Sequence, residues 1–437
     1  MANKLNEIIA SQFQLFENRL NGEKQLPVHK LRKDAFEALQ YNGLPDNKNE
    51  EYKFTRLTTL LERSFNLSMQ NATQSLTKKQ IDSELIKDID GSFLVFINGE
   101  YSKDISTIAE EHQNISIQNL SDAIKNDSEC FEHYFNKTKS YENDGFLSWN
   151  TAFTETGVKI SVESNKTYEK PIVLIFITDA AEQQFMGNPR ILIQIGENSE
   201  ITFLENFKTI GDNPSFNNLA LEIISEKASR VKYIKVQDDG GNTVHMSNSM
   251  VYQPDASNIS IFTFTFSGMM VRNNLNIVVD GEGCEANMYG LYWINGTTHV
   301  DNHTVVDHRK PNSISNELYK GIMDDESRGV FNGKIYVRQL AQKTNAFQSN
   351  NNILLSNDAT INTKPQLEIW ADDVKCSHGC TTGQLDDEQV FYLRSRGIDK
   401  DRAIGILLQA FANDIFDKTP VKELRGYLEE IVMDRLN

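Results

Sequence analysis

Three side chains that bind soft metals alternate along one short stretch of the chain. Cys376, His378 and Cys380 occupy every second position where β-rich sequence gives way to a helical pattern. On a strand, successive side chains point to opposite faces, so these three would line one face. Two thiols and an imidazole can hold a soft metal ion or an iron–sulfur intermediate. This stretch is therefore the first candidate site.

A single strand makes an incomplete metal cage. Residues two apart on one face are separated by about 6.6 Å along the backbone, so tetrahedral ligation needs a further ligand from elsewhere. The structural alternative stays open, because buried cysteines are small hydrophobes and a histidine can simply be hydrogen-bonded. Cys376 and Cys380 would lie about 13 Å apart, too far for a disulfide. Free thiols in a reducing compartment are expected.

A second polar set has the same spacing. His299, Asp301 and His303 alternate onto one face and could form another metal site. We favour a structural role for them, because buried polar side chains commonly satisfy each other by hydrogen bonding.

Composition limits the classes of protein to which the chain can belong. Its 437 residues, 39% hydrophobic and 24% charged, can bury a large core. The net charge of −17, from 61 acidic and 44 basic residues, argues against nucleic acid as a partner. No apolar run approaches the roughly 20 residues that cross a bilayer, and the first residues lack a signal-peptide pattern. We expect a cytoplasmic protein with no membrane partner.

Hydrophobic periodicity divides the chain into three parts. Apolar residues recur at helical spacing between Leu5 and Leu39, and again between Ala403 and Val432, where Thr419 and Pro420 predict the start of the last helix. From Phe146 onward, short strands follow one another without helical patterns between them, which excludes a doubly wound α/β fold. A sandwich, a barrel and a solenoid remain, since no clean repeat is visible.

Longer motifs around the candidate strand resemble the SufB/SufD family of iron–sulfur cluster assembly proteins. They are Lys364 to Gly379, Leu385 to Ile398 and Gly329 to Ser356, with weaker support from Glu50 to Thr55. The match is dense from about 299 to 397. The run Lys-Cys-Ser-His-Gly at 375–379 is similar to the D-type branch, SufD, whereas B-type chains usually carry a different run there.

The resemblance implies a mainly β fold with helical ends. Its core would be a right-handed parallel β-helix, a solenoid, over residues 146–383. An N-terminal α-rich subdomain over 1–145 and a C-terminal helical subdomain over 384–437 would flank that core and could cover the two ends that a solenoid leaves open.

The resemblance also implies partners and site residues. The chain would pair with a SufB-like protein, and His378 and Cys376 would face a cysteine of that partner. Cys380 carries no transferable role. Iron or an iron–sulfur cluster would be held transiently at the interface, with no stably bound cofactor. When isolated, the chain could form a homodimer.

Residues 384–437 would dock the ABC-type ATPase SufC, because an amphipathic helix laid in a partner's groove is an effective coupling device. ATP hydrolysis is expected in that partner, since this chain lacks a phosphate loop and an acyl-transfer serine elbow. The chain itself is then a non-catalytic assembly subunit. The candidate docking residues are Asp386, Phe391, Tyr392, Arg394, Arg396, Leu407 and Phe411.

Two other functions stay open. A B-type central scaffold would hold the nascent cluster itself and remain coloured when purified alone. A carbohydrate-active β-helix enzyme would need paired carboxylates, which Asp372–Asp373 and Asp324–Glu326 could supply. The enzyme is disfavoured, because adjacent residues on a strand face opposite ways and no secretion signal is evident.

Overall fold

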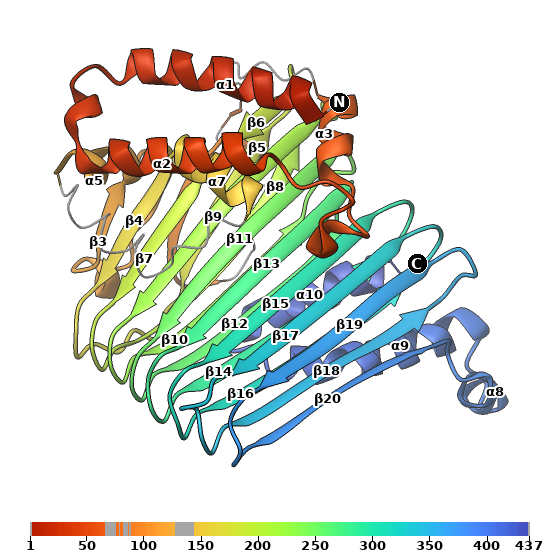
Figure 1. Cartoon of the computed structure of the whole chain (residues 1–437). Helices are drawn as coiled ribbons and strands as arrows, with labels where there is room; N and C mark the ends of the chain where they lie inside the picture. The colour runs from red at the N-terminus through yellow and green to blue at the C-terminus, as the bar shows by residue number, and fades with distance from the viewer. Residues whose placement is uncertain are drawn as a thin grey trace.

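Two ten-stranded sheets face each other along the whole length of the protein (Figure 1). The structure is a computed structural model that describes residues 2–65, 76–77, 79–81, 86, 89–126 and 144–435, without the side chains of residues 2–4 and 434. Cys130, the fourth cysteine, lies outside the described residues.

The first sheet contains mostly even-numbered strands and the second mostly odd-numbered ones. The strands of the first sheet, in spatial order, are β2 (Glu100–Tyr101), β1 (Ser92–Ile97), β5 (Ile172–Asp179), β8 (Glu200–Ile210), β10 (Arg230–Asp238), β12 (Asn258–Ser267), β14 (Glu285–Ile294), β16 (Ile314–Met323), β18 (Asn345–Leu354) and β20 (Lys375–Gly383). Those of the second are β19 (Thr360–Ile369), β17 (Arg328–Val337), β15 (His299–His308), β13 (Met270–Val279), β11 (Thr243–Gln253), β9 (Ser215–Ser225), β7 (Arg190–Ile195), β4 (Gly157–Val162) and β3 (Ser116–Asn119), with β6 (Phe185–Gly187) beside β9.

The chain alternates between the two sheets, and this winding makes a parallel β-solenoid of about eight turns. From β4 onward, parallel register partners in neighbouring coils lie 26 to 33 positions apart, as Val244 with Met270 and Gly157 with Arg190 show. The expected solenoid fold with helical ends is therefore confirmed. The repeat was not visible in the sequence, because the coils differ in length and equivalent positions in successive coils carry different residue types.

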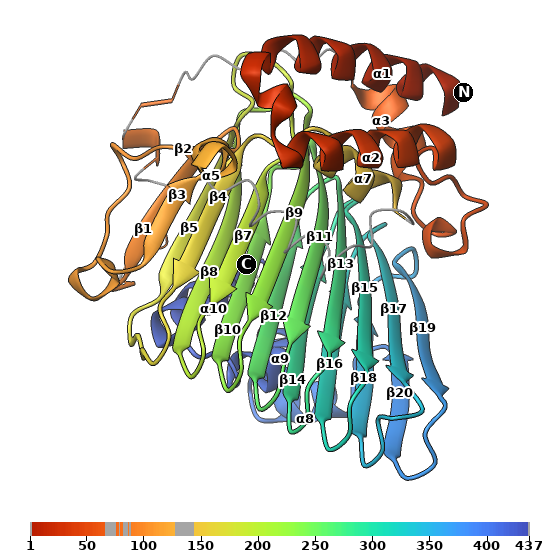
Figure 2. The same cartoon turned by 60° about the vertical axis from the view of Figure 1, so that its left-hand side comes forward.

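Helices cover the outer faces of both sheets, on opposite sides of the solenoid (Figure 2). The N-terminal helices pack on β9, β11 and β13, and the C-terminal helices pack on the first sheet. The helices are α1 (Ala2–Arg19), α2 (Pro27–Asn42), α3 (Leu57–Ser64), α5 (Leu120–Asn126), α7 (Gly145–Ala152), α8 (Asp387–Ser395), α9 (Lys400–Phe416) and α10 (Lys422–Asp434), with 3-10 helices η1 (Asn21–Gln25), η2 (Glu50–Tyr52) and η3 (Glu110–His112).

This arrangement corrects two expectations. The helices flank the sheets instead of covering the ends of the solenoid, because the strands are apolar on their outer faces as well as inside. In β5, Leu174 and Phe176 face the space between the sheets, whereas Val173 and Ile175 belong to the cluster under α9 and α10. Helix α10 begins at Lys422, so the prediction that Thr419 caps it was wrong; Thr419 instead donates to Ile415 O at 3.4 Å.

Strands from before residue 146 also belong to the sheets. β1 pairs in parallel with β5, and β3 pairs antiparallel with β4. The division of the chain at residues 145 and 146 therefore stays a prediction about separable units. None of the described helices is both long and apolar enough to cross a lipid bilayer.

Tight packing inside the solenoid pairs large rings with glycines in neighbouring strands. Gly290 is the register partner of Tyr319, and a Cβ at Gly290 would lie 2.2 Å from the Tyr319 ring. At the corners between strands the backbone turns through the left-handed region, for example at Ala228 (φ 58°) and Ala256 (φ 56°). These features set the stacking register of the coils.

Candidate functional site

The candidate strand β20 is the last strand of its sheet. It pairs on one side with β18, and no strand among the described residues pairs with its other side, which is the open edge of the sheet. The second sheet ends in the same way at β19. The two final strands lie beside each other at one end of the solenoid (Figure 1). Unpaired strand edges are templates for pairing with another chain.

Cys376, His378 and Cys380 share one face of β20, as the sequence predicted. Their register partners in β18 are Ala346, Gln348 and Asn350, all of them buried between the sheets. The three candidates therefore project from the inner face of the solenoid, one coil beyond the last covered layer. His378 and Cys380 are exposed, whereas Cys376 is half-buried against the Ala346 and Ala371 cluster.

Among the described residues, Cys284, Cys376 and Cys380 form no disulfide. Partial burial raises the pKa of the Cys376 thiol above its ordinary value. Thiolates bind metals, so a metal would have to displace the Cys376 proton. Within the described ranges, no three His, Cys, Asp or Glu side chains are grouped so that they could hold a metal ion. Strand β20 therefore supplies metal-binding side chains but too few of them to complete a metal site.

Sequence reasoning missed the two residues that lie beneath His378 in the stack of coils. Gln348 is its register partner in β18, and Glu317 is the partner of Gln348 in β16. Gln348 Nε2 donates to Glu317 Oε2 at 2.6 Å. Burial raises the pKa of Glu317 to about 7. The hydrogen bond from Gln348 lowers that pKa, but burial has the larger effect. Their spacing of about one coil length could have revealed them, had the repeat been recognised.

The His299, Asp301 and His303 face makes hydrogen bonds and ion pairs within the chain, which supports the structural role favoured from the sequence. The 3-10 helix η2 and the residues after it lie across β13, β15 and β17 and occupy this face. The Thr55 hydroxyl donates to Asp301 and lies 3.2 Å from His299 Nε2. His303 lies between Asp301, at 2.9 Å, and Glu51, at 3.3 Å.

Arg272 completes this network from β13. It donates to Asp301 and, at 2.8 Å, to the backbone oxygen of Glu51, and its guanidinium carbon lies 3.8 Å from the centre of the Tyr52 ring. Burial alone would raise the pKa of Asp301, but Arg272 and His303 outweigh it and hold that pKa well below its usual range. Hydrogen bonding from His303, with further help from Lys334, lowers the pKa of Glu51 to about 2. The motif at 50–55 therefore anchors the N-terminal segment to β13, β15 and β17 of the solenoid.

The seven candidate docking residues separate into two groups. Five lie exposed on α8 or at its ends: Asp386, Phe391, Tyr392, Arg394 and Arg396. Phe391 is 71% exposed and Tyr392 is 57% exposed, and α8 buries none of its residues. Leu407 and Phe411 are half-buried on α9, where Phe411 lies over Lys320 of the solenoid. Helix α9 thus anchors the subdomain, while α8 presents free aromatic surface.

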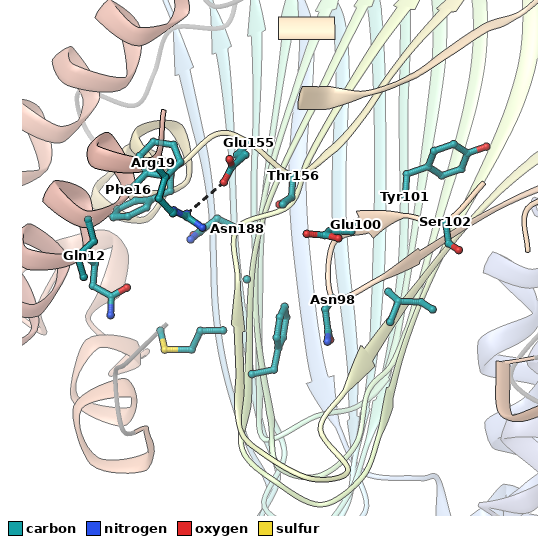
Figure 3. Close-up of a pocket in the computed structure, with 16 residues that line it drawn as sticks. Gln12, Phe16, Arg19, Asn98, Glu100, Tyr101, Ser102, Glu155, Thr156 and Asn188 are labelled. Carbon is teal, nitrogen blue, oxygen red and sulfur yellow. Dashed lines mark ion pairs between the residues drawn. The ribbon is translucent and has the colours of Figure 1, made fainter. Parts of the chain in front are cut away.

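A cavity near the N-terminal end of the solenoid is remote from these residues. It has a volume of about 540 Å³ and lies between α1, β6 and the turn from β1 to β2 (Figure 3). Arg19 and Glu155 form an ion pair of 3.5 Å at its edge, while Asn98 and Glu100 line the opposite side. Its lining contains no cysteine or histidine, so it adds no donor to the candidate site.

Comparison with known proteins decides the family. Residues 176–411 match the family model described as SUF system FeS cluster assembly, SufBD core domain, and residues 4–174 match the SufBD protein N-terminal region. The chain belongs to the SufB/SufD family. The matched core includes the whole of β20 together with α8.

Several relatives of this SufB/SufD chain are similar over nearly their full length. The iron–sulfur cluster assembly protein SufD of Escherichia coli is 32% identical over 87% of this chain and 86% of its own. An iron–sulfur cluster assembly SufBD family protein of Synechocystis is 32% identical over 94% of this chain and 92% of its own length. The chloroplastic protein ABCI7 of Arabidopsis thaliana is 28% identical over 92% of this chain and 84% of its own length. The recognition made from the motifs is thereby confirmed: the chain is a SufD homologue of the iron–sulfur assembly family.

Proposed function

We propose that this SufD homologue is a non-catalytic scaffold subunit that pairs with a SufB-like protein through the open end of its solenoid. The observation that carries the proposal is the coincidence of two features at one place. The sheets end there in unpaired edges at β19 and β20, and His378 and Cys376 project from the inner face of that same edge. A partner that extends the sheets would bring its own side chains opposite them.

Iron or an iron–sulfur cluster is the proposed cargo of this interface, held transiently and not as a resident cofactor. The donors fit, because thiolate and imidazole bind iron and clusters. One strand supplies too few converging ligands, so the partner must supply the others. His378 and Cys376 are the primary candidates, with Cys380 the weakest of the three. In this way the chain would assist iron acquisition and cluster assembly.

A SufC-like ABC ATPase is the proposed second partner, bound by residues 384–437. Phe391 and Tyr392 offer aromatic anchors, and Arg394 and Arg396 offer positive charge beside them. Aromatic and arginine side chains dominate the energetics of protein interfaces. That partner would hydrolyse ATP. A displacement of α8 on ATPase binding would be transmitted to the solenoid through α9, which packs on the first sheet. The proposal keeps the cytosolic location expected from the sequence.

Anaerobic co-expression with SufB-like and SufC-like proteins tests the assembly. Mass measurement gives the stoichiometry, and iron and sulfide analysis gives the cluster content. We expect a ternary complex that loses only the ATPase when Phe391 and Tyr392 are both changed to alanine, and keeps it when Tyr41, an exposed aromatic residue of α2, is changed to alanine. A complex that keeps the ATPase after removal of residues 384–437 contradicts the docking proposal.

Cluster content tests the site residues. His378→Ala is expected to leave the complex assembled but poor in cluster, whereas Ser377→Ala, on the opposite face of β20, serves as the matched control. Normal cluster content in the His378 variant removes that residue from the mechanism. The same preparation of the isolated wild-type chain should be colourless. A coloured chain would favour the B-type scaffold role instead.

A further inference from the structure

A column of three polar side chains runs from the buried interior of the solenoid to its open end. Glu317 in β16, Gln348 in β18 and His378 in β20 are consecutive register partners. Glu317 and Gln348 are each only 4% exposed, so the column is buried from bulk solvent below its last member. In-register side chains on neighbouring strands project from the same face about 4.8 Å apart, within reach of a hydrogen bond.

The amide of Gln348 has a fixed direction. In the structure its nitrogen points inward, because Gln348 Nε2 donates to Glu317 Oε2 at 2.6 Å. The opposite sheet restricts the amide as well, because it passes over Gly333 of β17, where a Cβ would lie 2.0 Å from Gln348 Nε2. Gly333 thus leaves room for an amide held between the sheets.

The other end of the amide is unsatisfied. Gln348 Oε1 is buried and accepts no hydrogen bond from any residue that the structure describes. A buried acceptor without a donor is destabilising, so such groups usually have a specific partner. The next side chain outward in the column is the exposed imidazole of His378, which has a ring N–H to donate and free space in which to turn.

We propose that Glu317 and Gln348 are positioning residues for His378, with Gln348 Oε1 accepting the proton of one imidazole nitrogen. That bond selects one tautomer and turns the second nitrogen, with its lone pair, toward the open end. Metal-binding histidines generally need such an oxygen partner on the far nitrogen, which orients the ring and raises its basicity. The inference rests on the proposed role of His378 in iron or cluster binding.

Nitrogen NMR of the isolated full-length chain tests the contact without any assembly reaction. The eight histidines are labelled with ¹⁵N, and the His378 signals are assigned by their loss in His378→Gln. In the wild type we expect one His378 nitrogen at the shift of a protonated ring nitrogen and the other at the shift of an unprotonated one. Gln348→Leu, which removes the acceptor, should move both toward the averaged values of a free imidazole. Gln348→Glu keeps an acceptor and should preserve the separation.

Gln253→Leu is the matched control. Gln253 is also buried in the solenoid, also donates through Nε2 and also leaves its Oε1 without a partner, but it lies on β11, several coils away. It should perturb folding to a similar degree without changing the His378 signals. Identical His378 signals in the wild type and Gln348→Leu overturn the positioning proposal, whatever happens in assembly.

Assembly measurements separate this inference from the proposed function. Loss of a partner that orients a metal ligand typically lowers metal affinity or activity by about 10-fold or more. We therefore expect Gln348→Leu to lower cluster content in the co-expressed complex by about 10-fold, with recovery in Gln348→Glu. Averaged wild-type signals refute the column. Separated signals together with normal assembly by His378→Ala leave the column intact and refute the role of His378.

Discussion

Replacing Glu317 by glutamine should make the protein's stability less dependent on pH. Glu317 is a carboxyl group buried between the sheets, and burial raises its pKa from 4.5 to about 7. Because the folded state then holds the proton more tightly than the unfolded chain, this group contributes stability below its unfolded pKa. That contribution is lost as the pH rises through about 7.

The magnitude follows from the two pKa values. A difference of one pKa unit corresponds to about 1.4 kcal/mol, so the change from 4.5 to about 7 is worth roughly 3 kcal/mol at most. Glutamine has nearly the shape of the protonated acid and never ionises. Glu317→Gln should therefore match the wild type near about pH 4, below both pKa values, and exceed it by up to about 3 kcal/mol near about pH 8.

Urea unfolding of both proteins at the two pH values measures the difference. Glu326→Gln, which removes an exposed carboxylate at the corner after β16, shows what the loss of one negative charge does by itself. A Glu317→Gln advantage that is equal at both pH values, or a loss of stability near about pH 8, would refute the argument from burial.

Three further predictions test the packing of the fold by urea unfolding. Arg272→Met should cost about 3–5 kcal/mol, because it leaves the buried carboxylate of Asp301 without its cation. Ala256→Gly should stabilise the protein by about 0.5–1 kcal/mol, because the left-handed backbone there (φ 56°) suits glycine better. Gly290→Ala should cost about 1–3 kcal/mol or more, because its Cβ would meet the Tyr319 ring at 2.2 Å.

Each of these variants has a matched control. Arg309→Met removes a half-exposed arginine paired with Asp307 and should cost less than about 1 kcal/mol. Ala286→Gly, within β14, should destabilise the protein by about 1 kcal/mol, opposite in sign to the corner variant. Gly241→Ala adds a Cβ where nothing lies within 4 Å, so it should be nearly neutral. A reversal within any pair would contradict the local account of that site.

Local patterns in the sequence were sufficient for several features. Helical spacing gave α1, α2, α9 and α10, because an apolar stripe appears within a few turns. Alternation along one strand placed Cys376, His378 and Cys380 on a common face of β20, since that property depends only on the period of a strand. Motif resemblance selected the solenoid from the three all-β folds that remained.

Long-range contacts were not readable in the same way. The His299, Asp301 and His303 face meets a segment almost 250 positions earlier, as the separations of 244 and 246 from Thr55 show. Nothing in the spacing of the three polar residues indicates that Thr55, Glu51 and Arg272 are their partners. The structural role was favoured on general grounds, and only the folded chain supplied the contacts.

The sequence by itself determined the chemistry of this protein: which donors alternate on the last strand, which segments are helical and to which family the chain belongs. The tertiary structure decided where that chemistry lies. Coils of 26 to 33 residues stack on one another, and this stacking puts Glu317 and Gln348 beneath His378 and leaves β20 at an open edge. The physical reason is that strand period is a local property, whereas stacking register depends on the lengths of all the corners between coils.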